Sequence, residues 1–336
     1  MAVAPMSSAV TTYPLSSSGT PPTPSMLGSQ DFQLQSEMKA TIENEITGAT
    51  YYVDLTAENS ILSAEPRIVQ AVNRDLKTTF KYLTYEGESS PAHPRLPKHG
   101  FSHEPPSYEP FVQLLNKITD TARKHIPPSP LAPLRQLRFH RFGREVKETY
   151  GSKNLKPDGV GILCPLPTNT RELSWEHIEV AIESKGRVRE MVRQSGTYAR
   201  CCLIGNRRRF FSLVIGFNFS TLEAYVFLFH QSGLSSSRPL DVTTQQGFES
   251  LVSHIVGILS IKDEAAYGLD PTRFQNMFRI NNRLYELVRH LYVRESLRGR
   301  ATIVYRLQGT SKYTCGFWCR TSLMHRIPRR QTPPWA

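Results

Sequence analysis

Residues 181–200 read AIESKGRVREMVRQSGTYAR and pass from a strand pattern into a helical one. Up to Lys185 the stretch is typical of a buried strand, and beyond it apolar residues recur at three- and four-residue spacing. At about 100° per residue, one helical face collects the apolar side chains of Val188, Met191, Val192, Ala199, Cys202 and Leu203. We therefore predict a strand followed by a helix that buries this face.

Further strand patterns lie on both sides of this unit. They are rich in aromatic and β-branched residues and read LRQLRFHRFG at 134–143, DGVGILCP at 158–165, HIEVAIESK at 177–185, RRFFSLVIGFNFS at 208–220 and EAYVFLFHQ at 223–231. Helical patterns cover residues 109–126, 186–204 and 245–261. Hairpin strands followed by a helix and further strands predict a mixed sheet flanked by helices, an α/β or α+β fold.

Composition along the chain divides it into four parts. Residues 1–30 are rich in Ser, Thr and Pro and are expected to form a disordered tail. Residues 31–108 read as a helical segment and a linker broken by Pro and Gly, and residues 109–268 as the α/β domain. Residues 269–336 look like the start of a second β-rich unit, and the last of them, from 315 on, show neither helix nor strand periodicity.

The overall charge favours acidic partners. The 336 residues include 41 Lys and Arg against 29 Asp and Glu, a net charge of +12, which suits nucleic acid. Five cysteines without metal-ligand spacing argue against a zinc site or a disulfide framework and suggest reduced thiols. Neither a signal peptide nor an apolar run of about 20 residues is evident. We expect an intracellular protein, nuclear or cytoplasmic, with no membrane partner.

A candidate site lies where the predicted hairpin opens. Asp158 stands at the mouth of one strand, and Glu183 and Lys185, two apart on another, point to the same sheet face. If residues 158–165 and 177–185 pair, the two carboxylates approach each other with the ammonium beside them. Two carboxylates suit Mg²⁺, which lowers the pKa of bound water, and the lysine would offset developing negative charge.

The helix after Lys185 carries polar residues on two flanks. Gln194 and Tyr198, four apart, share one flank with Arg187. Residues 186–210 contain seven arginines against a single acid, a composition that would suit a surface tracking phosphates. Each motif alone has a plainer interpretation, because an ExK triplet is often a solvated pair, PD a turn, and the RRR at 207–209 a solvated turn.

The ordered set PD, ExK and QxxxY resembles the PD-(D/E)xK nuclease superfamily, whose fold is the restriction-endonuclease-like mixed sheet. The resemblance implies metal ligation by Asp158 and Glu183 and a catalytic role for Lys185. It assigns substrate or DNA contacts to Gln194 and Tyr198. Many members add an acid from the preceding helix, for which Glu109 is the candidate here. The implied cofactor is Mg²⁺ and the implied partner nucleic acid.

A longer span, about 109–309, is similar to the N-terminal region of the fungal-type protein kinases. The matching pieces include KPDGVGI, WEHIEVAIESK, QSGTYAR, LVSHIVGILS and YELVRHLYVRESLRGRATIVYRL. The last piece leads into the kinase nucleotide loop in that family, and Gly299 and Thr302 would belong to it.

The chain departs from the kinase pattern in two ways. FHQSG stands where a DRSG-like turn is usual, and no VAIK-like lysine, HRD loop or DFG motif follows. We therefore expect a truncated kinase region that neither uses ATP nor acts as a kinase in this chain. Two functions stay open: a Mg²⁺-dependent nuclease-like domain, or an inactive regulatory module with protein partners in an ATP-dependent Ser/Thr kinase.

Overall fold

The computed structural model describes residues 35–83, 96, 100–146, 155–163, 173–274, 277–293, 303–309 and 315–320. The chain divides into two units, Met1–Phe32 and Gln33–Ala336. The expected disordered tail at residues 1–30 and the nucleotide-loop residues Gly299 and Thr302 lie outside the described residues.

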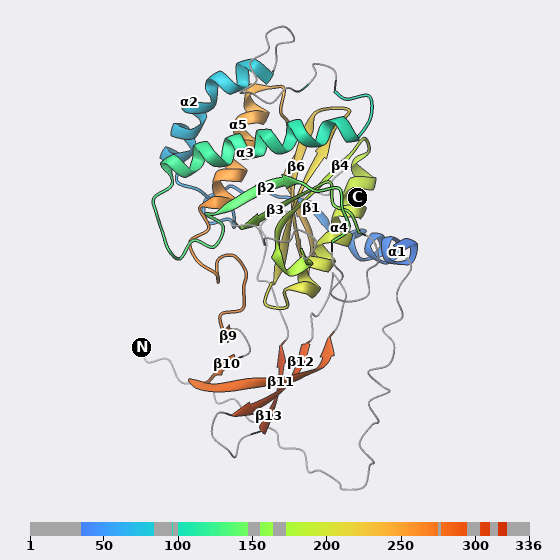
Figure 1. Cartoon of the computed structure of the whole chain (residues 1–336), viewed down its shortest axis with the longest axis vertical. Coiled ribbons are helices and arrows are strands. Elements are labelled where there is room, and N and C mark those ends of the chain that lie inside the picture. Colours follow the sequence, from blue (N-terminus) through green and yellow to red (C-terminus); the bar gives the residue numbers. More distant parts are fainter. Residues whose placement is uncertain are drawn as a thin grey trace, which may run out of the picture. The chain divides into compact units, whose positions relative to one another are not determined.

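The helices and strands of the first part of the chain form a mixed α/β domain (Figure 1). Its helices are α1 (Gln35–Ile46), α2 (Pro66–Leu83), α3 (Tyr108–His125), α4 (Val188–Gly205) and α5 (Gln245–Leu259), with short 3₁₀ turns at Pro105–Ser107 and Trp175–His177. Its strands are β1 (Thr50–Tyr52), β2 (Leu137–Arg141), β3 (Gly159–Leu163), β4 (Ile178–Lys185), β5 (Phe211–Asn218), β6 (Glu223–His230), β7 (Gly233–Ser236) and β8 (Leu240–Asp241).

These eight strands make one mixed sheet, as the sequence predicts. The order is β1-β7-β6-β5-β4-β3-β2, and β8 pairs with β6. β3 is antiparallel to both β2 and β4, whereas β4 and β5 are parallel because α4 connects them. Three short strands, β1, β7 and β8, were not predicted.

Helices cover both faces of the sheet, and the period of two along the central strands explains why both faces are apolar. In β5, Leu213, Ile215 and Phe217 pack with α2, α3 and α5, while Val214 packs with α1 and α4. Figure 1 shows α2, α3 and α5 on one side of the sheet and α4 on the other. The predicted face of α4 is confirmed, since Met191, Val192, Ala199 and Cys202 are buried.

A glycine in β5 lets α4 approach the sheet closely. A Cβ at Gly216 would lie 2.7 Å from Met191 Sδ and 2.6 Å from a ring carbon of Phe227. Because both contacts are shorter than van der Waals distances, any larger residue at this position would force Met191 or Phe227 to shift. This close packing sets the position of α4 beside β4, where the candidate site lies.

Side chains of α3 form hydrogen bonds with the backbone along the free edge of β2. Asn116 Nδ2 donates to the carbonyl of Phe139 at 2.8 Å, and the Phe139 amide donates to Asn116 Oδ1 at 3.0 Å. The Arg123 guanidinium donates to the carbonyls of Arg135 and Leu137. These bonds satisfy backbone groups that an edge strand otherwise exposes for pairing with another chain.

We expect Asn116→Ala to lower the free energy of unfolding by about 1–3 kcal/mol, because it leaves a part-buried N–H and C=O of Phe139 without partners. Urea unfolding measures this change. Gln113→Ala on the same helix is the control, since Gln113 is exposed and its side chain bonds the exposed Glu109, so its effect should stay within about 0.5 kcal/mol. Equal effects of the two substitutions would contradict the role of Asn116.

The remaining strands form a second sheet, in the order β13-β12-β11-β10-β9. They are β9 (Arg273–Phe274), β10 (Met277–Ile280), β11 (Arg283–Val293), β12 (Ile303–Gly309) and β13 (Cys315–Arg320). Asn281 and Asn282 both have positive φ, as a two-residue hairpin between β10 and β11 requires. Phe278, Tyr305 and Leu307 form a small buried core. The expectation of no strand from residue 315 on is wrong, because pairing with β12 orders Cys315–Arg320 as β13.

Candidate functional site

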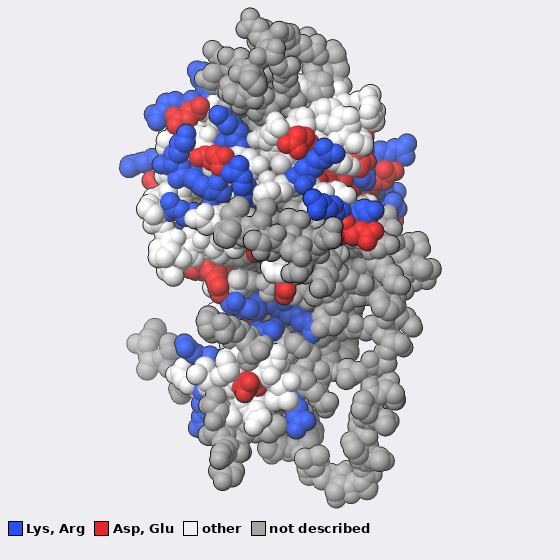
Figure 2. Space-filling view, viewed as in Figure 1, with Lys and Arg blue, Asp and Glu red and all other residues white. Residues whose placement is uncertain are grey.

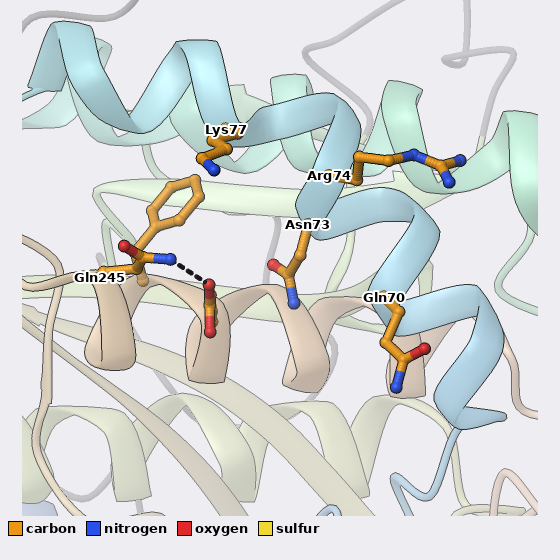
Figure 3. Close-up of a pocket in the computed structure, with 7 residues that line it drawn as sticks. Gln70, Asn73, Arg74, Lys77 and Gln245 are labelled. Carbon is orange, nitrogen blue, oxygen red and sulfur yellow. Dashed lines mark hydrogen bonds between the residues drawn. The ribbon is translucent and has the colours of Figure 1, made fainter.

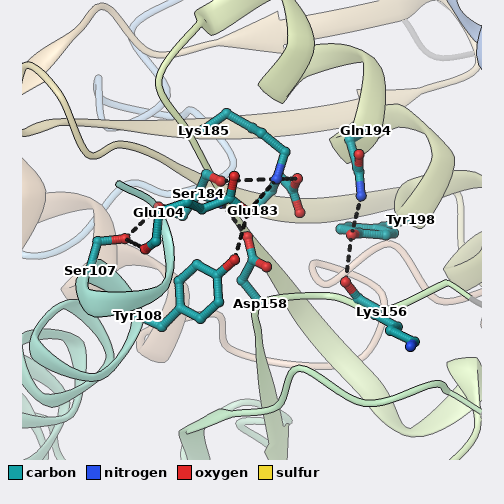
Figure 4. A network of polar contacts seen from close by, with 10 residues as sticks. All are labelled: Glu104, Ser107, Tyr108, Lys156, Asp158, Glu183, Ser184, Lys185, Gln194 and Tyr198. Carbon is teal, nitrogen blue, oxygen red and sulfur yellow. Dashed lines mark hydrogen bonds and ion pairs between the residues drawn. The ribbon is translucent and has the colours of Figure 1, made fainter. Parts of the chain in front are cut away.

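The structure brings Asp158, Glu183 and Lys185 together at one end of the β3–β4 hairpin (Figure 4). The two strands pair with Gly159 opposite Ile182, so the residues that follow this pair outward, Asp158 and Glu183, lie at the same edge. The backbone amide of Ser184 donates to Asp158 Oδ2 at 2.8 Å. The Lys185 ammonium lies 2.8 Å from Glu183 Oε1.

The carboxylates of Asp158 and Glu183 are both buried. Asp158 is 8% exposed and Glu183 is 0% exposed, because β4 is buried on both faces. Among the described residues, neither oxygen of Glu183 accepts a well-aligned hydrogen bond, although Lys185 makes an ion pair with one of them. A fully buried carboxylate with so few partners is costly, so its retention in the fold requires an explanation.

A third carboxylate, Glu104, completes this cluster. Lys185 Nζ donates to Glu104 Oε1 at 2.6 Å, and the Tyr108 hydroxyl donates to the same oxygen at 2.6 Å. Ser107, in the same segment, lies 2.9 Å from the Ser184 hydroxyl, Oγ to Oγ. The short turn before α3 is thereby fixed to the end of β4, and one ammonium faces three acids.

Glu109, the acid expected from the preceding helix, lies elsewhere. It is exposed on the first turn of α3, and its Oε1 accepts a hydrogen bond from Gln113. The structure therefore places Glu104, and not Glu109, beside Lys185. No local pattern singles out Glu104, which falls in a stretch that the sequence marks only as a Pro-rich connection.

The charges in this cluster shift one another's pKa values. Burial raises the pKa of Glu183 well above its ordinary value, the charge of Asp158 raises it further, and Lys185 opposes both. Burial also raises the pKa of Asp158, again against Lys185. Burial alone would lower the pKa of Lys185, but Glu183, Asp158 and the bond to Glu104 together raise it. Lys185 is therefore a firmly protonated cation.

Gln194 and Tyr198 brace the site from α4. Gln194 Nε2 donates to the Tyr198 hydroxyl at 2.8 Å, and that hydroxyl donates to the carbonyl of Lys156 at 2.9 Å. Tyr198 is fully buried and its ring stacks on Trp175 at 5.6 Å between centroids. The pair fixes the segment that leads into Asp158, so in this structure Tyr198 faces the interior and not a substrate.

Three arginines at the start of α4 pair with acids. Arg187 is exposed and pairs with Glu190 at 3.5 Å, while Arg189 and Arg193 both reach Glu43 on α1. Figure 2 shows Lys and Arg side chains interspersed with Asp and Glu on the face in view. These pairs reduce the net charge that the arginine-rich stretch offers to a phosphate backbone.

The RRR at residues 207–209 is not a solvated turn throughout. The side chain of Arg209 is 1% exposed and donates to Glu179 Oε2 and to the carbonyl of Ile178, each at 2.7 Å. Its guanidinium lies 5.6 Å from the centroid of the Tyr267 ring. Arg208, by contrast, forms a partly exposed pair with Glu264. The solvated interpretation is therefore wrong for Arg209, which links β4 to the end of the domain.

The family model described as fungal protein kinase matches residues 166–318. Residues 166–318 are thus similar to the fungal protein kinase family. No curated protein and no solved structure matches the chain. The matched range is just under half of the chain. Within the fungal protein kinase match lie Glu183, Lys185, Gln194 and Tyr198, whereas Asp158 and Glu104 precede it.

The residues of this cluster fit a divalent cation in chemistry and charge. Carboxylate oxygens are the ligands that Mg²⁺ prefers, the two oxygens of Glu183 lack well-aligned donors, and three acids outnumber one lysine. In the part of the chain that the structure describes, no group of three His, Cys, Asp or Glu residues is already spaced to hold a metal. Likewise, none of its helices has the length and apolar character of a membrane span.

Proposed function

We propose that this chain carries a PD-(D/E)xK-like centre that binds Mg²⁺ at Asp158 and Glu183 and cleaves phosphodiester bonds of nucleic acid. The supporting observation is Glu183, a fully buried acid without a well-aligned hydrogen bond among the described residues, beside a second buried acid and a lysine. Titratable groups with pKa values shifted by burial and by specific charge partners are typical of functional sites.

Each residue has a distinct role in this proposal. Asp158 and Glu183 would hold the ion, which when bound acts as a Lewis acid and lowers the pKa of water. Lys185 would offset negative charge on the phosphoryl oxygens. Because its pKa is raised, Lys185 would act as a cation and not as a general base. Glu104 would have to release Lys185 for the phosphate, since it now holds the ammonium. Gln194 and Tyr198 would keep the segment before Asp158 in place.

The test combines metal binding with cleavage. Calorimetric titration with Mg²⁺ should show saturable binding that Asp158→Asn abolishes. Nicking of plasmid DNA, or cleavage of a labelled RNA, should fall by about 100-fold or more in Lys185→Ala, by analogy with the loss of one transition-state contact. Glu109→Gln is the matched control, because Glu109 is exposed and apart from the cluster. Unchanged cleavage in Lys185→Ala would rule out the catalytic claim.

The second candidate is an inactive regulatory module of a fungal-type protein kinase, with a protein as its partner. The observation that favours it is that the cluster satisfies its own charges: Glu104 and Glu183 neutralise Lys185, and Glu183 has no exposed surface. In this case Mg²⁺ would not bind saturably, and Asp158→Asn would leave partner binding unchanged. The calorimetric titration thus separates the two candidates.

A further inference from the structure

The connection between α3 and β2 carries a serine set among prolines. Residues 127–130 read PPSP, so Ser129 has proline at the two positions before it and at the one after it. In the part of the chain that the structure describes, no other Ser or Thr is followed directly by proline. Proline fixes its own φ and restricts the residue before it to extended conformations. The sequence therefore favours an extended backbone up to Ser129, and Ile126 has such a conformation, with φ −75° and ψ 123°.

The chain around Ser129 is open to solvent. Pro127, Pro128 and Pro130 are exposed, and Leu131 is 69% exposed. Ser129 itself is partly buried, and its Oγ accepts a hydrogen bond from the amide of Leu131 at 3.3 Å. Among the described residues, no group accepts a hydrogen bond from the Ser129 hydroxyl. The hydroxyl of Ser129 is thus available to an external enzyme.

The turn that holds Ser129 opens at little cost. Its backbone bond, from the Ala132 amide to the Ser129 carbonyl, is 3.4 Å long, beyond the usual range for N–H···O bonds. The core begins again at Ile126 and Leu134, which are 8% and 0% exposed. Residues 127–132 can therefore straighten between these two anchors without exposing the apolar core. An extended segment of this kind is what the substrate groove of a protein kinase binds.

The proline after Ser129 restricts the class of enzyme. Pro130 has no N–H and a fixed φ, so a substrate groove that binds the N–H of the residue after the acceptor excludes this serine. Proline-directed Ser/Thr kinases are the class that accepts, and requires, proline at this position. Ser129 therefore has the sequence and the exposure of a substrate of that class.

The ends of the loop carry more cations than acids. Arg135 Nη1 donates to the carbonyl of Pro127 at 2.8 Å, so this guanidinium lies against the segment that leads into Ser129. The last turn of α3, just before the loop, consists of Arg123, Lys124 and His125. A phosphoserine carries about −1.5 to −2 charges at neutral pH, and its oxygens accept charge-assisted hydrogen bonds from arginine. Arg135 is the arginine placed to receive them.

The acids near the loop are already paired. Asp75 Oδ2, on α2, lies 2.8 Å from His125 Nε2. Asp120 Oδ1, on α3, lies 2.8 Å from Arg123 Nη1. Beside Asp75, the Arg74 side chain is 75% exposed and extends away from the pocket between α2 and α5 (Figure 3). A phosphate on the loop would therefore enter a region whose net charge is positive.

We propose that Ser129 is the acceptor of a phosphoryl group that a separate, proline-directed Ser/Thr kinase transfers from ATP. Ser129 Oγ bonds to the γ-phosphorus while the bond from that phosphorus to the β–γ bridging oxygen breaks. ADP leaves, and the hydroxyl proton passes to the catalytic base of the kinase. The phosphate then pairs with the Arg135 guanidinium.

The Ser129 loop and the candidate site lie at opposite ends of the same pair of strands. β2 begins at Leu137 and ends at Arg141, which pairs with Gly159 of β3. Asp158 directly precedes Gly159, so the candidate site lies at the end of β2, whereas the Ser129 loop comes before its start. The proposal therefore stands whether or not the candidate site is catalytic.

The test is phosphorylation of the full chain by an activated mitogen-activated protein kinase, a proline-directed enzyme, with ATP and mass spectrometry that resolves each site. Site resolution is needed because proline also follows Thr20, Thr23, Ser90 and Thr332. We expect phosphate on Ser129. Pro130→Ala should lower the initial rate at Ser129 at least about tenfold, whereas Pro133→Ala, the matched control in the same loop, should leave it within about twofold.

Two outcomes would overturn the assignment of Ser129: no phosphate on this residue, or an equal rate at Ser129 in wild type and Pro130→Ala. Unchanged thermal unfolding of the two proline variants is the check on folding.

The contact with Arg135 has its own measurement. In a chain whose Thr20, Thr23, Ser90 and Thr332 are replaced by alanine, ³¹P NMR follows the titration of the phosphate on Ser129. Pairing with Arg135 should hold the pKa of this phosphate below its ordinary value of about 6, and Arg135→Gln should raise the pKa again. Arg187→Gln is the matched control, because Arg187 is an arginine with 82% of its side chain exposed, close to the candidate site. Equal titration with and without Arg135→Gln would overturn the pairing with Arg135.

Discussion

Arg209→Met is expected to lower the free energy of unfolding by about 3–5 kcal/mol. The Arg209 side chain is 1% exposed, and it is the partner of Glu179, whose side chain is 12% exposed. Removing the guanidinium leaves Glu179 with a charge in a nearly dry environment and leaves the carbonyl of Ile178 without this donor. Breaking one half of a buried ion pair is far more costly than the pair's net contribution, because the other charge stays buried.

Two variants make this expectation specific. Arg208→Met, one residue earlier, removes an arginine whose partner Glu264 has 56% of its side chain exposed, so the cost should be below about 1 kcal/mol. The double variant Arg209→Met with Glu179→Leu removes both charges, and most of the stability should return. Urea unfolding of the three variants gives the comparison. If Arg209→Met cost no more than Arg208→Met, the buried pair would not stabilise the domain as argued.

The main elements of the fold could be predicted because hydrophobic periodicity reports burial directly. The helix predicted at 109–126 is α3 (Tyr108–His125), and the one at 245–261 is α5 (Gln245–Leu259). The strands that escaped prediction are short and weakly patterned. β7, GLSS, has a single apolar side chain besides glycine, and its pairing with β6 and β1 makes it a strand. Tertiary pairing of this kind leaves no local signal.

The candidate site was predictable only where its residues are linked by local geometry. Asp158, Glu183 and Lys185 follow from strand alternation and one hairpin register. Glu104 lies 81 residues from Lys185 in the chain, so no periodicity connects them. Arg209 was missed for a related reason. A run of arginines is usually solvated, and only the fold brings Glu179 and Tyr267 to it. Ion pairs between residues far apart in the chain are thus the interactions that sequence patterns do not predict.

Lys185→Met should lower the free energy of unfolding by about 3–5 kcal/mol above neutral pH, and by much less in mild acid. Lys185 is the cation that opposes the burial of Glu183, whose side chain is 0% exposed. Without it, the pKa of Glu183, already raised, rises further. The folded state then keeps a proton that the unfolded state releases, so stability falls as the pH rises from the ordinary pKa of a glutamate toward the raised one.

Urea unfolding of wild type and Lys185→Met at about pH 5 and about pH 8 measures this dependence. The deficit of the variant should grow between the two conditions, because protonation removes the buried charge only at the lower pH. Adding Glu183→Gln to Lys185→Met should recover most of the stability at the higher pH and abolish the pH-dependent difference, since a neutral amide cannot ionise. A deficit that is equal at both pH values would mean that Lys185 stabilises the fold by packing of its aliphatic chain, and not by balancing Glu183.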